Sequence, residues 1–143
     1  MCRRLGVSCR AFVLGGNKPD KVARKIRAVV PNFGRIVVLK DVHGLRREVL
    51  ARLEEILRGV GGSAKVMVLL VEKSVESWIL AGLCEERAEE LDEAGLRLME
   101  RLGRIVVKTF EEYRRLAQAI DLEHAARKSK SFKAFVEAVR ELR

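Results

Sequence analysis

Apolar residues in the first half of the chain fall into three short runs that predict β-strands. Residues 35–39 and 65–71 are rich in Val, Ile and Leu and lack a regular polar alternation, as in strands buried on both faces of a sheet. Residues 10–14 form a third short run of the same kind. Each run is followed by a segment of different periodicity, which indicates that strands and helices alternate along the chain.

Helical spacing of apolar positions follows each predicted strand. Residues 19–30 place them on one helical face, and Pro19 suits the first turn, where its missing N–H would be unpaired in any case. Residues 44–58 and 74–83 show similar spacing, with Ser74 as a candidate N-cap. The pattern predicts an α/β fold: a small, three- to four-stranded, mainly parallel sheet with helices on both faces.

The second half of the chain is predicted to be a helical cover on the same core. Trp78, the only tryptophan, is expected to pack in that core. The chain is therefore interpreted as one domain over residues 1–143, with a βα core at about 10–83 and a mostly helical cover at about 84–143. The predicted elements of the cover are a charged amphipathic helix at 85–102, a short strand at 104–107, and helices at 110–120, 122–127 and 132–142.

Composition narrows the class of protein. Hydrophobic residues make up 48% and charged residues 34%, which is typical of a globular protein with a highly charged surface. No apolar run approaches the roughly 20 residues of a membrane helix, and the first residues lack a signal-peptide core. Three cysteines without a CxxC pair are expected to be free thiols in a reducing compartment. We expect a cytoplasmic protein with no membrane partner, and the many charged residues resemble thermophile compositions.

The net charge of +9 favours an acidic partner, and nucleic acid is the commonest. Basic residues recur on the first predicted helix, among them Lys18, Lys21 and Arg24, and again over residues 127–133. Such groups suit phosphate contacts, which give affinity without reading sequence. The alternative interpretation is that they are solvated faces balanced by nearby acids.

Polar residues with metal-binding capacity follow the two strongest strands. Asp41 and His43 come at the end of one, and Glu72 and Glu76 follow the other. Because neighbouring parallel strands end at one edge of a sheet, these side chains are expected to share a site there. The set predicts a Mg²⁺ site, with Mn²⁺ as the alternative. Equally, Asp41 could cap the next helix, and an acid at position 76 would stabilise a helix N-terminus without any function.

Other catalytic patterns are weak or absent. The turn from Gly15 to Lys18 slightly resembles a phosphate-binding turn, but neither GxxxxGK[ST] nor GxGxxG occurs. No GxSxG motif is present, and with only two histidines a Ser-His or Cys-His enzyme is disfavoured. Lys18 and Lys40 are the residues expected to contact phosphate beside a metal site.

Three motifs together resemble the toprim-like domains of unknown function found in prokaryotes. They are Asp41-Val42-His43-Gly44, the stretch from Glu72 to Ala81 (E-x-x-x-E-x-W-x-L-A), and a C-terminal Ser-Phe-x-x-Phe segment at 131–135. The resemblance implies a Mg²⁺-binding fold that supports phosphodiester cleavage or transfer in nucleic acids. Two departures are His43 in place of the second aspartate and the absence of a glutamate-bearing first strand, since about nine residues precede Arg10. Either Glu72 or Glu76 substitutes, the sequence begins too late, or catalysis is lost.

Three functional hypotheses follow. The first is a metal-dependent phosphodiester enzyme with Asp41, Glu72 and Glu76 as catalytic residues and Asp41, His43 and Glu72 as metal ligands. In it, Lys18, Lys21, Arg24 and Lys40 bind phosphate. The second is a non-catalytic nucleic-acid-binding domain with a degenerate toprim site. The third is a protein-interaction component, a homodimer whose interface is the helix at 85–102.

Overall fold

Two parallel strands form the sheet of this computed structural model, which describes residues 1–12, 18–41, 47–60 and 65–141. Strand β1 (Arg35–Asp41) pairs with β2 (Lys65–Val71) in a register that sets Arg35 beside Lys65 and Asp41 beside Val71. The two strands therefore end level with one another. The prediction of an α/β fold with a parallel sheet is confirmed in this smaller form.

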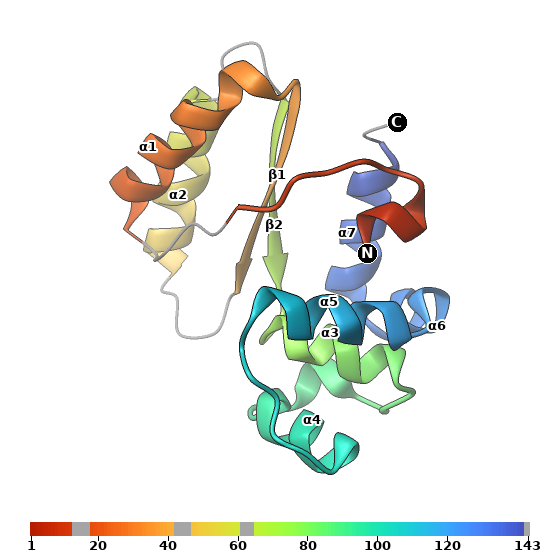
Figure 1. Cartoon of the computed structure of the whole chain (residues 1–143). Helices are drawn as coiled ribbons and strands as arrows, with labels where there is room; N and C mark the ends of the chain where they lie inside the picture. The colour runs from red at the N-terminus through yellow and green to blue at the C-terminus, as the bar shows by residue number, and fades with distance from the viewer. Residues whose placement is uncertain (13–17, 42–46, 61–64, 142–143) are drawn as a thin grey trace.

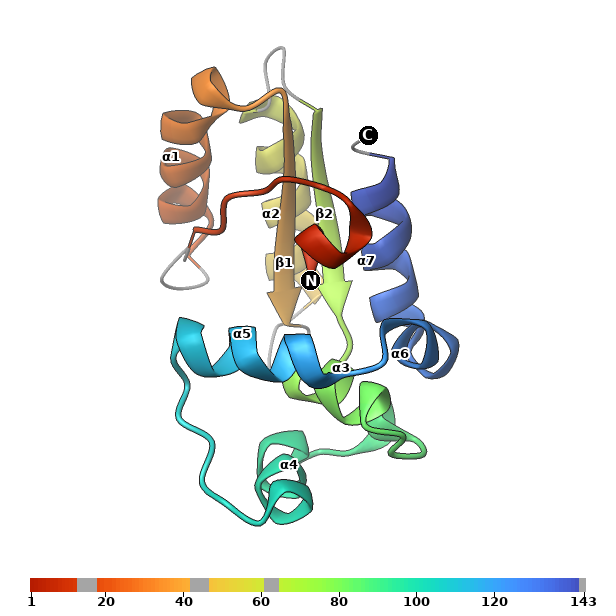
Figure 2. The ribbon, with the colours of Figure 1, turned by 45° about the vertical axis from the view of Figure 1, so that its right-hand side comes forward.

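A third or fourth strand is not found among the described residues, so this part of the prediction is wrong for them. Arg10 to Phe12 have no regular structure, and residues 13–14 of the predicted strand lie outside the described ranges. Figures 1 and 2 show the N-terminal segment crossing over β1 rather than running beside it, so its backbone cannot join the ladder. Residues 104–107 also form no strand.

Helices cover both faces of the sheet, as predicted. Helices α1 (Pro19–Val29) and α2 (Arg47–Val60) lie on one face, and α7 (Lys130–Arg140) packs against β2 on the other (Figure 2). Side chains alternate between the two faces along each strand. Val38 joins the core beneath α1 and α2, whereas Leu39 and Val71 join the core on the α7 side.

The elements between residues 75 and 128 gather near the carboxyl ends of the strands (Figure 1). The helix predicted at 85–102 is interrupted, because Arg87 adopts a left-handed backbone with φ of 56° and only a short 3₁₀ turn follows before α4. The elements other than the strands, α1, α2 and α7 are η1 (Cys2–Leu5), η2 (Val30–Asn32), α3 (Val75–Gly82), η3 (Ala88–Glu90), α4 (Ala94–Leu102), α5 (Phe110–Ala119) and α6 (Leu122–Lys128).

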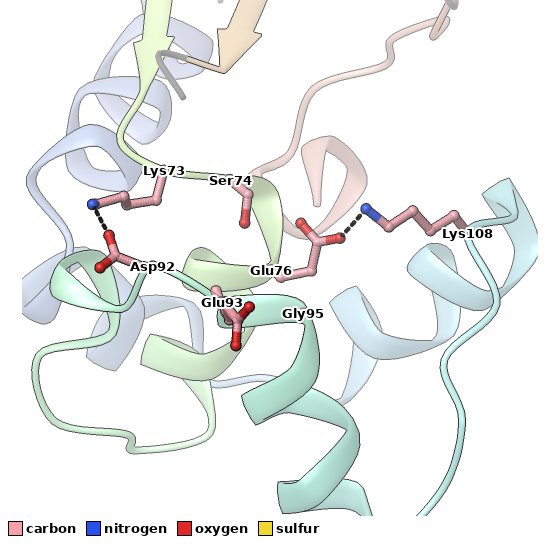
Figure 3. Close-up of a pocket in the computed structure, with 8 residues that line it drawn as sticks. Lys73, Ser74, Glu76, Asp92, Glu93, Gly95 and Lys108 are labelled. Atoms are coloured by element: carbon pink, nitrogen blue, oxygen red, sulfur yellow. Dashed lines mark hydrogen bonds and ion pairs between the residues drawn. The ribbon is translucent and has the colours of Figure 1, made fainter. Parts of the chain in front are cut away.

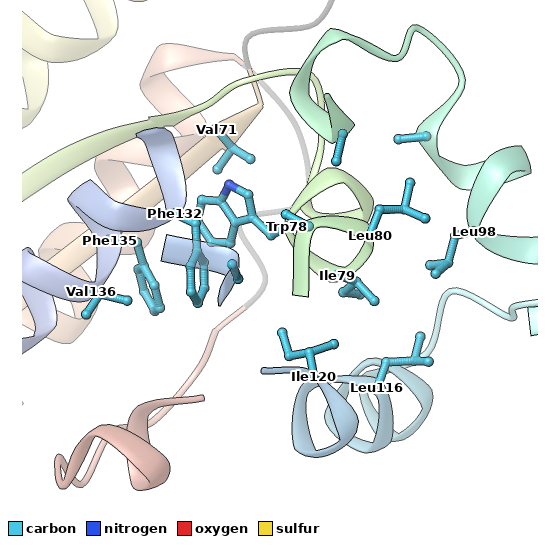
Figure 4. Close-up of a cluster of buried hydrophobic side chains, with 14 of the residues drawn as sticks. Val71, Trp78, Ile79, Leu80, Leu98, Leu116, Ile120, Phe132, Phe135 and Val136 are labelled. Carbon is cyan, nitrogen blue, oxygen red and sulfur yellow. The ribbon is translucent and has the colours of Figure 1, made fainter. Parts of the chain in front are cut away.

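Trp78 anchors the larger core, as the sequence predicts. Its ring is 1% exposed and lies 5.2 Å and 5.3 Å, between centroids, from Phe132 and Phe135 of α7 (Figure 4). Its indole N–H donates to Ser131 Oγ at 2.7 Å. The Trp and Ser-Phe-x-x-Phe motifs thus meet in the fold and have a packing role, since buried aromatic residues dominate core energetics.

Two further expectations concern the whole chain. The cysteines among the described residues are free: Cys2 is half-buried, and Cys9 and Cys84 are exposed. None of the helices in the described ranges is both long enough and apolar enough to cross a membrane.

Substitution of Gly82 by Ala tests the packing of α3 against Ile120, the residue that ends α5. A Cβ at Gly82 would lie 2.6 Å from Cβ of Ile120, whereas a Cβ at Gly95 of α4 meets nothing nearer than 4.0 Å. We expect Gly82→Ala to lower the free energy of unfolding by about 1–3 kcal/mol. Gly95→Ala should be neutral or raise it by about 0.5–1 kcal/mol through helix propensity. Urea unfolding of both variants measures this, and equal stabilities would contradict the packing.

Candidate functional site

The carboxyl end of the sheet is where the predicted acidic residues are expected to meet. Because the strands end level, Asp41 lies beside Val71 and Glu72 is one residue further along. Strand alternation directs Asp41 to the same face as Leu39, the α7 side, and Lys40 to the face covered by α1 and α2. The side chains of Asp41 and Lys40 are thus directed to opposite faces of the sheet.

Glu76 is the buried acid of this region. It lies in the first turn of α3, and only 6% of the residue is exposed. The Tyr113 hydroxyl of α5 donates to its Oε1 at 2.5 Å, and Lys108 Nζ lies 3.2 Å from the same atom. The carboxylate faces a pocket of about 170 Å³ (Figure 3). The pocket is lined by Lys73, Ser74, Glu76, Asp92, Glu93, Ala94, Gly95 and Lys108.

Hydrogen bonds keep Glu76 ionised despite its burial. Burial alone would raise the pKa of Glu76, but hydrogen bonds from Tyr113, the backbone, Ser74 and Lys108 outweigh that effect and lower the pKa below its usual value. The pKa of Tyr113 is raised well above its usual value by burial and by its hydrogen bond to Glu76. Glu76 is therefore a charged acceptor and Tyr113 a neutral donor at physiological pH.

Asp41 acts on the same hydroxyl group as Glu76. Its negative charge contributes to raising the pKa of Tyr113. Asp41 and Glu76, which the sequence predicts to share a site, thus both lie within electrostatic reach of one side chain. The convergence arises because α5 lies just beyond the end of β1 (Figures 1 and 2).

Two other predicted site residues are placed differently. Glu72 is exposed, and its backbone N–H donates to Ser131 Oγ at 3.4 Å, which ties this residue to α7. His43 lies outside the described residues. Within the described ranges, no three His, Cys, Asp or Glu residues form a group that could hold a metal ion. Carboxylate oxygens suit Mg²⁺, yet Asp41, Glu72 and Glu76 do not form a complete set of ligands by themselves.

Sequence reasoning missed several residues of the pocket. Lys73 has a left-handed backbone with φ of 62°, and its Nζ lies 2.5 Å from Asp92 Oδ1. Such a backbone is uncommon outside glycine and marks the corner between β2 and α3. Lys108 and Tyr113 approach Glu76 from α5 and the segment before it. No local pattern connects these residues to Glu76, because the contacts form only in the fold.

The predicted phosphate-binding residues divide into two environments. Lys18, Lys21 and Arg24 are exposed, and none of them forms an ion pair with a described residue. Lys40 is only 8% exposed, and burial lowers the pKa of its ammonium group. The first three are therefore open to a ligand in solution, whereas Lys40 sits inside the fold.

An exposed apolar strip borders the pocket. Ile105, Val107 and Phe110 are 78%, 61% and 72% exposed, and Lys108 lies among them. Ile105 and Val107 are β-branched residues, which are common in strands, and this explains the strand predicted at 104–107. The chain is irregular there because these residues pair with no described strand.

Homodimer formation stays a prediction. The helix predicted at 85–102 as its interface is shorter in the structure, where only α4 is an α-helix.

Replacement of Tyr113 by Phe tests the hydrogen bond to Glu76. The pKa of Glu76 is lower in the folded state than in the unfolded state, where it is about 4.3. The ionised carboxylate therefore stabilises the fold above about pH 4.3, and this stabilisation disappears as the pH falls through the folded-state pKa. We expect Tyr113→Phe to lower the free energy of unfolding by about 1.5–3 kcal/mol near pH 7 and by less near pH 3.

Urea unfolding at the two pH values measures this loss. Glu111→Gln is the control, because it removes an exposed charge that pairs with Arg114 on the same helix and should cost no more than about 1 kcal/mol. An equal loss for Tyr113→Phe at both pH values would show that the hydroxyl does not stabilise the ionised carboxylate.

Comparison with known proteins adds no relative. No family model matches the chain, and neither a curated protein nor a solved structure does so. The toprim-like resemblance therefore stays a prediction.

Proposed function

We propose that this chain binds nucleic acid through the basic surface of its N-terminal part. The observation that carries the proposal is the distribution of charge. Residues 1–41 contain ten Lys and Arg but two Asp and Glu, whereas the other 102 residues contain nineteen and eighteen. Nearly all of the +9 net charge thus belongs to η1, α1, β1 and the segments that join them.

Helix α1 carries the largest group of these cations, and Lys21, Arg24, Lys25 and Arg27 are all exposed. Its buried residues, Val22, Ala23 and Ile26, face the sheet, so Lys21 and Arg24 point to solvent. Lys18, at the N-cap, is exposed as well. Exposed cations without acidic partners attract a polyanion at long range and release its counterions on contact. Phosphate contacts of this kind position a nucleic acid without reading its bases.

Salt-dependent binding tests the proposal. We expect the protein to bind a fluorescein-labelled oligonucleotide, with an affinity that falls steeply with salt. The double variant Lys21→Glu, Arg24→Glu should bind at least about tenfold more weakly at low salt and reduce the slope of log K against log salt by about 2. Fluorescence anisotropy between about 50 and 200 mM salt measures both.

The matched control reverses two charges elsewhere. Arg127 of α6 and Lys133 of α7 are also exposed, and the pair Arg127→Glu, Lys133→Glu changes the net charge by the same amount. Its affinity should fall far less than that of the α1 variant. Equal losses would mean that total charge, and not the α1 surface, governs binding.

A second candidate function is a Mg²⁺-dependent phosphodiester enzyme, as the toprim-like resemblance implies. The observation that favours it is that Asp41 ends β1 at the same edge of the sheet where β2 leads into α3, whose first turn carries the buried carboxylate of Glu76. A divalent ion bound there would polarise a phosphoryl oxygen and orient the attacking group. Because Lys108 and Tyr113 already occupy Glu76 and the described donors form no group of three, no catalytic step is assigned to these residues.

Thermal shift with metal ions tests this second candidate. We expect Mg²⁺ or Mn²⁺ to raise the melting temperature of the wild type relative to EDTA, since a ligand that binds only the folded state stabilises it. Asp41→Ala should abolish the increase. The control is Glu123→Ala, which removes an exposed acid of α6 and should keep the increase.

Three results would reject a metal site at Asp41: no shift in the wild type, the same shift in Asp41→Ala, or loss of the shift in Glu123→Ala. A shift confined to proteins that retain Asp41 would justify nuclease assays with single- and double-stranded substrates.

A further inference from the structure

Phe12 is an aromatic side chain that the hydrophobic cores do not explain. It is 51% exposed, and neither Phe12 nor its neighbour Phe33 belongs to either core cluster. The ring is nevertheless held in place. Phe33 packs edge-on against it, with centroids 5.7 Å apart and an interplanar angle of 77°. Because Phe33 follows η2 directly after α1, this contact fixes Phe12 beside that helical region.

A guanidinium group covers part of the same ring. The Cζ atom of Arg10 lies 5.5 Å from the Phe12 centroid, within the range of a cation–π contact. Arg10 approaches the ring and Phe33 packs against it edge-on, yet half of the Phe12 side chain still faces solvent. The arrangement is an oriented aromatic surface rather than a loose side chain.

The sequence around Phe12 contains no acidic residue from residue 1 to residue 19. The first acid in the chain is Asp20, and Lys18, Lys21 and Arg24 follow Phe12 along the chain. Figure 1 shows the N-terminal segment leading from η1 across β1 toward the side of the sheet that carries α1. An exposed aromatic ring with a guanidinium group over it, in a segment that carries cations and no acid before Asp20, suits a ligand that combines a flat ring with phosphates.

We infer that Phe12 stacks on one unpaired base of a single-stranded nucleic acid, with the flanking phosphates on Arg10 and the basic residues of α1. The inference rests on the proposed nucleic-acid binding and adds the class of ligand. Bases inside a duplex are already stacked and leave no face for Phe12, whereas an unpaired base can stack on an aromatic ring. Since Phe12 is the only exposed aromatic residue described in this region, the surface accommodates one base.

The experiment compares an oligo-dT of about 12 nucleotides, within the usual site sizes, with a duplex of equal length by fluorescence anisotropy. EDTA is present throughout, so that a metal site does not contribute. Phe12→Ala should weaken binding of the single strand by about 5- to 150-fold, the loss that corresponds to one stacked base. The salt slope should not change, because no phosphate contact is removed. Binding of the duplex should change little.

Two further variants make the result specific. Phe110→Ala removes an aromatic residue that is 72% exposed elsewhere on the molecule and should leave single-strand affinity unchanged. Phe12→Trp keeps an aromatic surface, so it should retain affinity, and the indole fluorescence that it adds to that of buried Trp78 in the wild type should be quenched when oligo-dT stacks on it. Melting curves of each variant establish that the fold is retained.

The outcomes separate this inference from the proposed function. Binding of both nucleic acids with no effect of Phe12→Ala, or an equal effect on single strand and duplex, overturns the stacking role and leaves the basic surface in place. Failure of the wild type to bind either nucleic acid overturns both. Unquenched fluorescence in a Phe12→Trp protein that binds oligo-dT also rejects the stacked base.

Discussion

The hydroxyl group of Ser131 joins three parts of the fold at one point. Its Oγ accepts hydrogen bonds from the indole of Trp78 and from the backbone N–H of Glu72, and it donates to the carboxylate of Glu89. Glu89 also accepts from the backbone N–H of Lys130 at the start of α7, where the helix dipole favours a negative charge. Buried polar groups are costly unless they are paired, so this network holds β2, α3 and α7 in one arrangement.

The position of the candidate site follows from that arrangement. The corner between β2 and α3 carries Glu72 and Glu76. Ser131 fixes this corner, because its Oγ accepts hydrogen bonds from the backbone N–H of Glu72 and from the indole N–H of Trp78 in α3. With the corner fixed, Glu76 meets Tyr113 and Lys108. These partners favour the charged form of Glu76, and both of them contact its Oε1 atom. Lys108 is 80% exposed in its side chain, so it is the partner that a metal ion would displace more easily.

Charge divides the molecule into two regions with different properties. The N-terminal 41 residues are strongly basic, whereas the helical region contains nearly equal numbers of acids and bases, many in ion pairs such as Arg97 with Glu85. Ion pairs between exposed groups add little stability, but they neutralise the surface locally. The exposed cations Lys18, Lys21 and Arg24, which form no ion pair with a described residue, are therefore less neutralised than the cations of the helical cover.

Local periodicity determined much of this fold. The continuous apolar runs specify β1 and β2, and the helical spacing specifies α1, α2, α3 and the last three helices, because burial of one helical face or of both strand faces repeats at short range. The parallel pairing follows from the alternation of strand and helix. The packing of Trp78 was also evident, since a large apolar side chain is stabilised by leaving water. The charge asymmetry is a property of the sequence alone.

Tertiary structure decided the number of strands and the membership of the site. Residues 10–12 and 104–107 have strand-like composition, but a strand exists only where a neighbour supplies hydrogen bonds, and that depends on where distant segments run. Likewise, Glu76 and Tyr113 are 37 positions apart, and no spacing rule connects them. Which carboxylate is buried and ionised, and which lysine lies inside the fold, depends on contacts between remote segments. Local sequence patterns carry no direct record of those contacts.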